Sequence, residues 1–258
     1  INLALSDNQA KITKYDNPTG SLNEFYEGQK IGEIWGYVTE GIFQEDSEVA
    51  NHADQAQLGA NWRAGDIMYK DLNGDKKINQ GSNTLSDPGD RKIIGNWSPR
   101  YSFGINPDVS YKNWTLNVFF QGLFRDYLPE NGNWKAFYPY NAGHMEKYYI
   151  TESWSEDNRD AYFAAPTIGT NTKKNIQPQS RYVQNGAYIR LKNLTLNYNL
   201  PQSFIGKMGL SSASVYFAAQ NLWEATKMHK PIDPEVEFNN NTGLERNDLT
   251  QEYYFQRT

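Results

Sequence analysis

The sequence predicts an all-β fold of antiparallel strands in which short turns alternate with long loops. Apolar and polar residues alternate over 101–121, which is the pattern of strands with one apolar and one polar face. Aromatic residues make up 14% of the chain, and aromatic side chains favour strands over helices. Every second connection between predicted strands is far longer than the ~4–6 residues usual in compact domains. These three observations favour a sheet whose long loops all lie at one end.

The predicted strands follow this alternation along the chain, with local irregularities. Lys112 and Asn113 form the tight turn of a hairpin between two long strands. Pro107 interrupts the first of these strands, where a proline is tolerated only at a bulge or an unpaired position. The apolar residues are at odd positions before Lys192 and at even positions after Asn193. This shift of one residue in the alternation predicts a β-bulge. Strands are expected over 1–15, 22–37, 101–111, 114–121, 186–200 and 213–220, with a last strand from 251 and a short helix over 47–58.

Three long loops separate these strands, at approximately 38–99, 125–180 and 223–250. Outer-membrane barrels have this rhythm, with short turns on the periplasmic side and long loops on the extracellular side. Their apolar side chains face lipid, and a closed barrel leaves no unpaired strand edge there. The rhythm therefore favours a membrane barrel over a soluble sandwich or propeller, whose strands also alternate. Aromatic residues expected at strand ends, as interfacial girdles, are Trp35, Tyr37, Trp97, Tyr101, Tyr111, Trp114 and Trp223.

Composition argues against several classes of function. The net charge of −5 argues against nucleic acid as the main partner, because phosphate binding needs a basic surface. The chain has no cysteine, so it has no disulfide framework and no thiolate metal site. Its three histidines are isolated, and no hydrolase, P-loop or zinc-protease motif is present, so we expect no enzyme. The chain starts without Met and stops within a strand pattern, so we expect a fragment of a longer protein.

An acidic loop between Asp71 and Asn79 is the most compact polar motif. Asp71, Asn73 and Asp75 place side-chain oxygens at every second position. Lys77 would add its carbonyl, and Asn79 a direct or water-mediated contact. Oxygen ligands at this spacing are typical of structural Ca²⁺ sites. The alternative is a solvated turn in which Asp and Asn side chains hydrogen-bond to the backbone.

An aromatic segment in the second long loop is another candidate site. Aromatic rings stack on the apolar faces of sugars, but they also anchor protein interfaces and pack loops onto themselves. Packing of the loop, or of a partner protein, is the interpretation that we favour. The candidates for binding a ligand or a partner are Trp134, Phe137, Tyr138, Tyr140, Tyr148, Tyr149 and Trp154.

Several strings occur in a fixed order along the chain. They are GQKIGEIWGY (28–37), EGIF (40–43), GDI (65–67), DLNGDKKIN (71–79), GNWSPRYSFG (95–104), IRLKNLTLNYNLP (189–201), AQNLW (219–223) and DPE (233–235). No single string is decisive. The ordered set resembles the C-terminal part of the SusC/RagA-like TonB-dependent transporters, and the resemblance covers residues 28 to about 255.

The resemblance implies that 1–258 is the C-terminal portion of a 22-stranded transmembrane β-barrel in the bacterial outer membrane, with its three long loops outside the cell. It implies TonB-driven import of oligosaccharides or peptides, with the plug and the TonB-contacting part outside this chain. It also implies a SusD-like surface lipoprotein as a lid, and such transporter–lipoprotein pairs can dimerise. The other hypothesis is a soluble, calcium-stabilised β-sandwich that binds glycans.

The acidic loop departs from the family's pattern at two positions. Lys76 stands where the family has glycine, and it must accept the sharp turn at a cost. Ser82 stands at the twelfth position of the loop, where a carboxylate ligand is expected. Asp90 or Asp87 would therefore have to fold back to complete a Ca²⁺ site.

Overall fold

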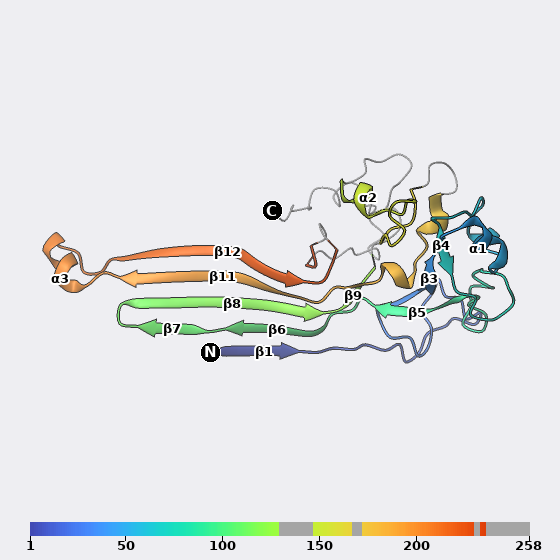
Figure 1. The fold of residues 1–258 in the computed structure, drawn as a ribbon. Helices are drawn as coiled ribbons and strands as arrows, with labels where there is room; N and C mark the ends of the chain where they lie inside the picture. The colour runs from blue at the N-terminus through green and yellow to red at the C-terminus, as the bar shows by residue number, and fades with distance from the viewer. Residues whose placement is uncertain (129–146, 167–171, 230–232, 236–258) are drawn as a thin grey trace.

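The computed structural model describes residues 1–128, 147–166, 172–229 and 233–235, and its largest unit is a sheet of six strands (Figure 1). The strands are β1 (Asn2–Ser6), β6 (Arg100–Asn106), β7 (Asp108–Tyr111), β8 (Trp114–Phe124), β11 (Tyr188–Asn199) and β12 (Ser214–Thr226). They are paired in the order β1-β6-β8-β11-β12, with β7 also on β8, and every pairing is antiparallel. No helix in the described ranges is long and apolar enough to cross a membrane.

Strands β7 and β8 form the predicted hairpin. Tyr111 and Trp114 are paired across its turn, and Lys112 has a left-handed backbone with φ of 52°. Left-handed residues in two-residue turns match the twist of the flanking strands. The connection from β11 to β12 runs through α3 (Gln202–Ile205) and η4 (Gly206–Met208). Both connections lie at the end of the sheet opposite the long loops (Figure 1).

Pro107 separates β6 from β7 without changing the register against β8. Ile105 pairs with Phe120 before the proline, and Asp108 pairs with Asn117 after it, so no residue is inserted. The Pro107 carbonyl still accepts a hydrogen bond from the backbone of β8, at 3.1 Å. The proline therefore removes only the hydrogen bond that its missing N–H would donate.

The predicted β-bulge lies in β11. The pairing of this strand with both neighbours shifts between Leu191 and Asn193, and Lys192 is the extra residue relative to β8. On β12 the facing irregularity includes Asn221, whose φ is 50°. Bulges re-aim side chains and interrupt the ladder locally, so this one sets the direction of the Lys192 side chain.

The register gives the sheet one apolar and one polar face. Residues paired across antiparallel strands share a face. Leu116, Leu196 and Phe217 form one such row, and Asn117 and Thr195 lie in a neighbouring row on the other face. The apolar face carries Leu3, Leu5, Phe103, Ile105, Trp114, Leu116, Val118, Phe120, Leu194, Leu196, Val215 and Phe217. The polar face carries Asp108, Ser110, Thr115, Asn117, Gln121, Arg190, Asn193, Thr195 and Asn197.

The apolar face is most exposed on the two edge strands of the described sheet, and most of its inner residues are half-buried. Leu3 and Leu5 are each 74% exposed, and Val215 and Phe217 are 63% and 61% exposed. In a β-sandwich such side chains would form the core between two sheets. Large exposed apolar areas mark contact with a partner or a membrane. The face therefore suits the wall of a membrane barrel, as the alternation predicted.

The first long loop is more ordered than predicted. Of the strand expected over 22–37 only β2 (Glu33–Tyr37) forms, and it pairs with β5 (Arg91–Asn96) outside the six-stranded sheet. The prediction of a strand over 22–32 is wrong, because this segment folds back locally. Gly28 N donates to Ile12 O, and Ile12 N donates to Gln29 O, each at 2.8 Å.

Two of the predicted girdle residues belong to this loop structure instead. Tyr37 is only 3% exposed and lies in a buried core. Trp35 donates from Nε1 to the Tyr26 hydroxyl at 3.2 Å. Their placement at a membrane interface is therefore wrong, since β2 is not a strand of the large sheet. Trp114 and Trp223, in contrast, lie on the large sheet and are about half exposed.

The long loops contain further short elements. The helix expected over 47–58 is present as α1 (Asp46–Asn51) and η1 (Ala56–Leu58). Glu45 and Glu48 form a capping box at the start of α1. The remaining elements are β3 (Thr39–Ile42), β4 (Ile67–Tyr69), β9 (Asp126–Tyr127), α2 (Lys147–Glu152), η2 (Thr172–Asn175), η3 (Ser180–Tyr182) and β10 (Gln184–Asn185); β3 pairs with β4, and β9 with β10.

The described residues of 33–96, 126–185 and 227–229, here called the loop body, pack around one core at the end of the sheet (Figure 1). None of the described core residues belongs to the six-stranded sheet. Described residues of all three long loops contribute to it, so the core fastens these parts of the loops to one another. The core residues are Tyr37, Ile42, Ile67, Tyr69, Ile78, Tyr127, Tyr149, Phe163, Ala164, Ile176, Tyr182 and Met228.

Candidate functional site

A buried ion pair joins the first and second long loops inside the loop body. Lys174 Nζ lies 2.5 Å from Asp66 Oδ2, and the two side chains are 2% and 0% exposed. The same carboxylate accepts from Arg63 N at 2.8 Å and from Asn175 Nδ2 at 2.8 Å. Asn175 Oδ1 in turn accepts from Ile67 N at 2.9 Å. Each buried charge is thus paired and hydrogen-bonded, as burial requires.

A second buried set of hydrogen bonds continues from this pair. Gln55 accepts from Tyr69 N at 2.7 Å through Oε1. The Tyr69 hydroxyl donates to Lys174 O at 2.7 Å and accepts from Gln179 Nε2 at 3.2 Å. Burial raises the pKa of Tyr69 well above its ordinary value, so the hydroxyl stays a neutral donor. The two loops are therefore joined by complementary polar groups as well as by apolar packing.

The third long loop joins the same body through His229. Its Nε2 lies 2.6 Å from Glu152 Oε2, and its backbone N donates to Gln184 Oε1 at 2.7 Å. The imidazole stacks on the Tyr162 ring, with 5.6 Å between ring centroids. Three segments far apart in the chain thus form one packed unit at the end of the sheet (Figure 1).

The acidic loop is closed by its own hydrogen bonds. Asp71 accepts from Gly74 N at 2.7 Å through Oδ1 and from Lys76 N at 2.9 Å through Oδ2. Asn73 Oδ1 accepts from Asp75 N at 2.9 Å. Desolvation opposes ionisation of Asp71, but the backbone donors Lys76 and Gly74 outweigh it and lower the pKa of this carboxyl. Backbone N–H groups therefore already donate to both carboxylate oxygens of Asp71 and to Asn73 Oδ1.

Lys76 adopts the left-handed conformation that the pattern assigns to glycine. Its φ is 63°, which costs a residue with a side chain about 1–2 kcal/mol relative to the right-handed region. Gly74 is also left-handed, with φ of 80°. Ile78 is fully buried in the core of the loop body and anchors the loop there.

Asp90 folds back to the acidic loop, as completing a Ca²⁺ site would require. Its oxygens accept from Leu72 N at 2.8 Å and from Asn79 N at 2.9 Å, and its side chain is fully buried. It therefore fastens the two ends of the loop together. Asp87 instead accepts from the backbone N and the hydroxyl of Ser82, at 2.8 and 2.6 Å. The described residues contain no group of three or more His, Asp or Glu side chains arranged to hold a metal ion.

The aromatic candidates divide between the loop body and undescribed parts of the chain. Tyr149 is 3% exposed and stacks on Phe163, with ring centroids 4.6 Å apart. Trp154 is half-buried and donates from Nε1 to Gln44 Oε1 at 3.2 Å. These two rings pack the loop body onto itself. Tyr148 lies in α2 and its side chain is outside the described set; Trp134, Phe137, Tyr138 and Tyr140 lie outside the described residues.

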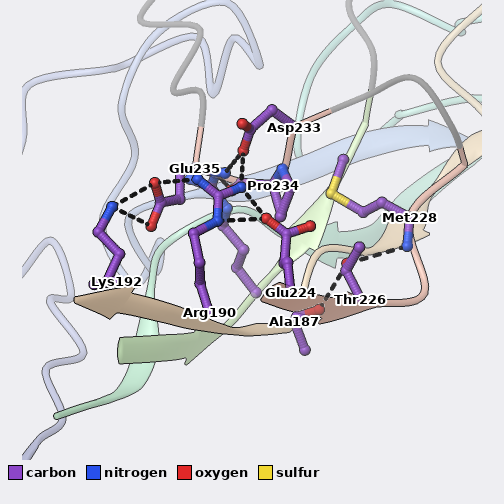
Figure 2. A network of polar contacts seen from close by, with 10 residues as sticks. Ala187, Arg190, Lys192, Glu224, Thr226, Met228, Asp233, Pro234 and Glu235 are labelled. Atoms are coloured by element: carbon purple, nitrogen blue, oxygen red, sulfur yellow. Dashed lines mark hydrogen bonds and ion pairs between the residues drawn. The ribbon is translucent and has the colours of Figure 1, made fainter. Parts of the chain in front are cut away.

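An ionic network on the polar face was not foreseen from the sequence. Arg190 on β11 contacts three carboxylates, namely its cross-strand partner Glu224 on β12, Asp233 and Glu235 (Figure 2). Lys192 binds both oxygens of Glu235, at 2.9 and 3.1 Å. The sequence did contain a signal for this network. The string DPE (233–235) places two acidic residues shortly after β12, and Arg190 and Lys192 are basic residues on a face that otherwise carries mainly amides and hydroxyls.

Comparison with known proteins gives consistent relatives. No family model matches the chain. TonB-dependent receptor P3 of Formosa agariphila is 33% identical over 226 residues, which cover 86% of this chain and 20% of the relative. TonB-dependent receptor P26 of the same organism is 30% identical, covering 81% of this chain and 19% of the relative. The chain thus spans about a fifth of the length of these relatives.

Solved structures give the same fold. The RagAB peptide transporter matches 86% of this chain and 22% of its own, with a TM-score of 0.53 and 23% identity. The RagAB peptide importer in its open-open state matches 92% of this chain and 24% of its own, with a TM-score of 0.56 and 22% identity. The chain belongs to the TonB-dependent receptors, and its fold is that of part of the RagAB transporters.

The RagAB structures account for the architecture. The six-stranded antiparallel sheet has the fold of a section of the β-barrel in those structures. The relatives are receptors and transporters and not enzymes, which confirms the prediction from the missing catalytic motifs. The ordered strings therefore identified the family, although no single string did.

Proposed function

We propose that the longer protein to which this SusC/RagA-like segment belongs imports oligosaccharides or peptides across the outer membrane, driven by TonB. In this proposal the segment supplies part of the barrel wall and the loop body is extracellular. The observation that carries it is the loop body itself, because all three long loops pack into one core at a single end of a two-faced sheet. The TonB-dependent relatives support the same assignment.

The loop body is the proposed platform for a SusD-like surface lipoprotein. Its internal ion pair and hydrogen bonds preorganise the surface, and a preorganised surface loses less entropy when a partner docks. The aromatic candidates at Trp134, Phe137, Tyr138 and Tyr140 are proposed contacts for this lid or for substrate. A dimer of transporter–lipoprotein pairs is part of the same proposal.

The full-length transporter tests this function directly. We expect it to fractionate with the outer membrane and to co-purify with a surface lipoprotein encoded beside it. Uptake of an oligosaccharide or a peptide mixture should stop when TonB is deleted or when an uncoupler removes the proton-motive force. The matched control is a passive porin substrate, whose entry should continue. Recovery of the protein from the soluble fraction, or uptake that persists without TonB, would overturn the proposal.

Structural Ca²⁺ binding by the acidic loop is a separate proposal. The spacing of Asp71, Asn73 and Asp75 supports it. The Lys77 carbonyl, Asn79 and Asp90, which folds back to the loop, would complete the oxygen set. Because these oxygens also serve backbone donors, we expect affinity in the range of extracellular modules, roughly 10⁻⁴–10⁻³ M. Millimolar Ca²⁺ should slow amide hydrogen exchange over 71–79 in the full-length protein, and Asp75→Asn should remove the effect. Equal exchange with Ca²⁺ and with a chelator would leave only a hydrogen-bonded turn.

A further inference from the structure

The turn Asp233-Pro234-Glu235 fills a cationic site on the polar face of the sheet (Figure 2). We propose that this turn is an exchangeable internal anion, and that carboxylate-bearing ligands compete with it for Arg190 and Lys192. The inference rests on the proposed importer function, because it assigns the loop-end region of the polar face to a ligand. It predicts a preference for acidic peptides or acidic oligosaccharides over neutral ones.

The cationic site is built by fixed strand residues. Arg190 approaches Asp233 Oδ1 at 2.7 Å and Glu235 Oε2 at 2.5 Å with its two terminal nitrogens. The fork of a guanidinium suits simultaneous contact with carboxylate oxygens. Lys192 adds an ammonium 2.9 Å from Glu235, and the bulge in β11 directs it there. Both cations are thus preorganised by the sheet, whatever carboxylate they hold.

Side chains hold the turn in place. Besides Arg190 and Lys192, the Arg125 guanidinium donates to Pro234 O, and Asp233 closes the turn by accepting from Glu235 N at 2.9 Å. Contacts of this kind are the ones that a ligand carrying two carboxylates and a carbonyl can reproduce. The side chains of Asp233 and Glu235 are 15% and 23% exposed, so the turn is partly accessible to solvent.

The balance of charge requires an anion at this place. Arg125, Arg190 and Lys192 bring three positive charges, and Glu224, Asp233 and Glu235 bring three negative ones. Of the ion pairs described here for Arg190 and Lys192, only the one between Arg190 and Glu224 would remain without the turn. Removing the carboxylate partner of a largely buried cation strongly destabilises the folded protein. The turn is therefore expected to leave only when another anion takes its place.

Exchange of this kind favours the binding of an acidic ligand over that of a neutral one. A ligand shifts an equilibrium only through its different affinity for the two states. A neutral ligand cannot replace the carboxylates, so it meets the polar face with the turn docked. An acidic ligand replaces the charges of the turn and gains a cationic site.

Neutralisation of the turn in the full-length transporter tests the exchange. The variant Asp233→Asn with Glu235→Gln removes the internal competitor and keeps the shape of both side chains. Binding of tetraglutamate and of trigalacturonate is measured by calorimetry, beside tetraglutamine and the methyl ester of trigalacturonate. We expect at least one acidic probe to bind about fivefold tighter or more to the variant than to the unchanged protein. The probe that gains identifies the source of the carboxylate, and the neutral counterparts should not gain.

Two further variants make the result decisive. Adding Lys192→Gln to the neutralised turn should abolish the gain, and Glu235→Gln alone should give a smaller gain in the same direction. The heat-dependent shift of the barrel band on gels checks that each variant is folded. Equal affinity of both acidic probes for the unchanged and neutralised proteins, or an equal gain by the neutral probes, would overturn the exchange. Because binding is measured without TonB, a failure of uptake sinks the importer proposal separately.

Discussion

Replacement of Asp66 by alanine is expected to unfold the loop body while the six-stranded sheet persists. The change leaves the ammonium of Lys174 buried without its carboxylate, and it removes the acceptor for Arg63 N and Asn175 Nδ2. Breaking one side of a buried ion pair costs about 3–5 kcal/mol, a large fraction of the stability of a typical domain. Amide exchange over 33–96 and 172–182 in the full-length transporter should rise by at least about a hundredfold.

An exposed ion pair of the same loop provides the matched control. Lys70 and Glu40 are 3.8 Å apart, and their side chains are 51% and 41% exposed. Lys70→Ala is expected to change stability by less than about 0.5 kcal/mol, because exposed pairs are screened by solvent. If Asp66→Ala left exchange as slow as Lys70→Ala does, the buried pair would not hold the loops together. Loss of lipoprotein co-purification in Asp66→Ala would further support the loop body as its platform.

Arginine in place of Leu194 is expected to destabilise the barrel by about 2–4 kcal/mol. Leu194 pairs with Val118 and Ala219 near the middle of β11, on the exposed apolar face. A cation on the lipid face near the bilayer midplane costs this much, and the cost falls toward the interfaces. Urea unfolding of the full-length transporter in lipid vesicles, followed by tryptophan fluorescence, measures the change.

The neighbouring residue offers a control with the same substitution on the same strand. Thr195 pairs with Asn117 and Ala218 on the polar face, so an arginine there enters a wet environment. Thr195→Arg is expected to cost less than about 1 kcal/mol. Equal losses for the two variants would mean that the two faces do not meet different solvents, and the membrane assignment of the sheet would be wrong.

Local patterns predicted the sheet because each pattern is set by neighbours in sequence. The hairpin at Lys112 and the bulge at Lys192 follow from alternation and its break. The strand over 22–32 failed because alternation cannot tell a barrel strand from a segment that folds back within a loop. The prediction that Tyr37 lies in an interfacial girdle was wrong for a similar reason. An aromatic residue at a strand end suits a girdle and a buried core equally well.

The organisation of the loops depended on contacts that sequence spacing does not reveal. Asp66 and Lys174 are 108 residues apart, and each alone is an ordinary charged loop residue. The contacts of Arg190 with Asp233 and Glu235 likewise depend on the register of β11 with β12 and on the path of the chain after β12. For the acidic loop, the alternative of a turn held by side-chain-to-backbone hydrogen bonds was open from the spacing. Asp90 fastens the ends of the loop through contacts with Leu72 N and Asn79 N that the spacing does not reveal.

The shared core of the loop body has a consequence for how such surfaces diverge. Exchange of one loop alone between two relatives would separate residues that contact each other across loops. Here a single transplanted loop would bring Lys174 without Asp66, or His229 without Glu152, and leave a mismatched junction. The three segments are therefore expected to be inherited as a set. Sequence differences between relatives should be concentrated in residues that face outward from this common core.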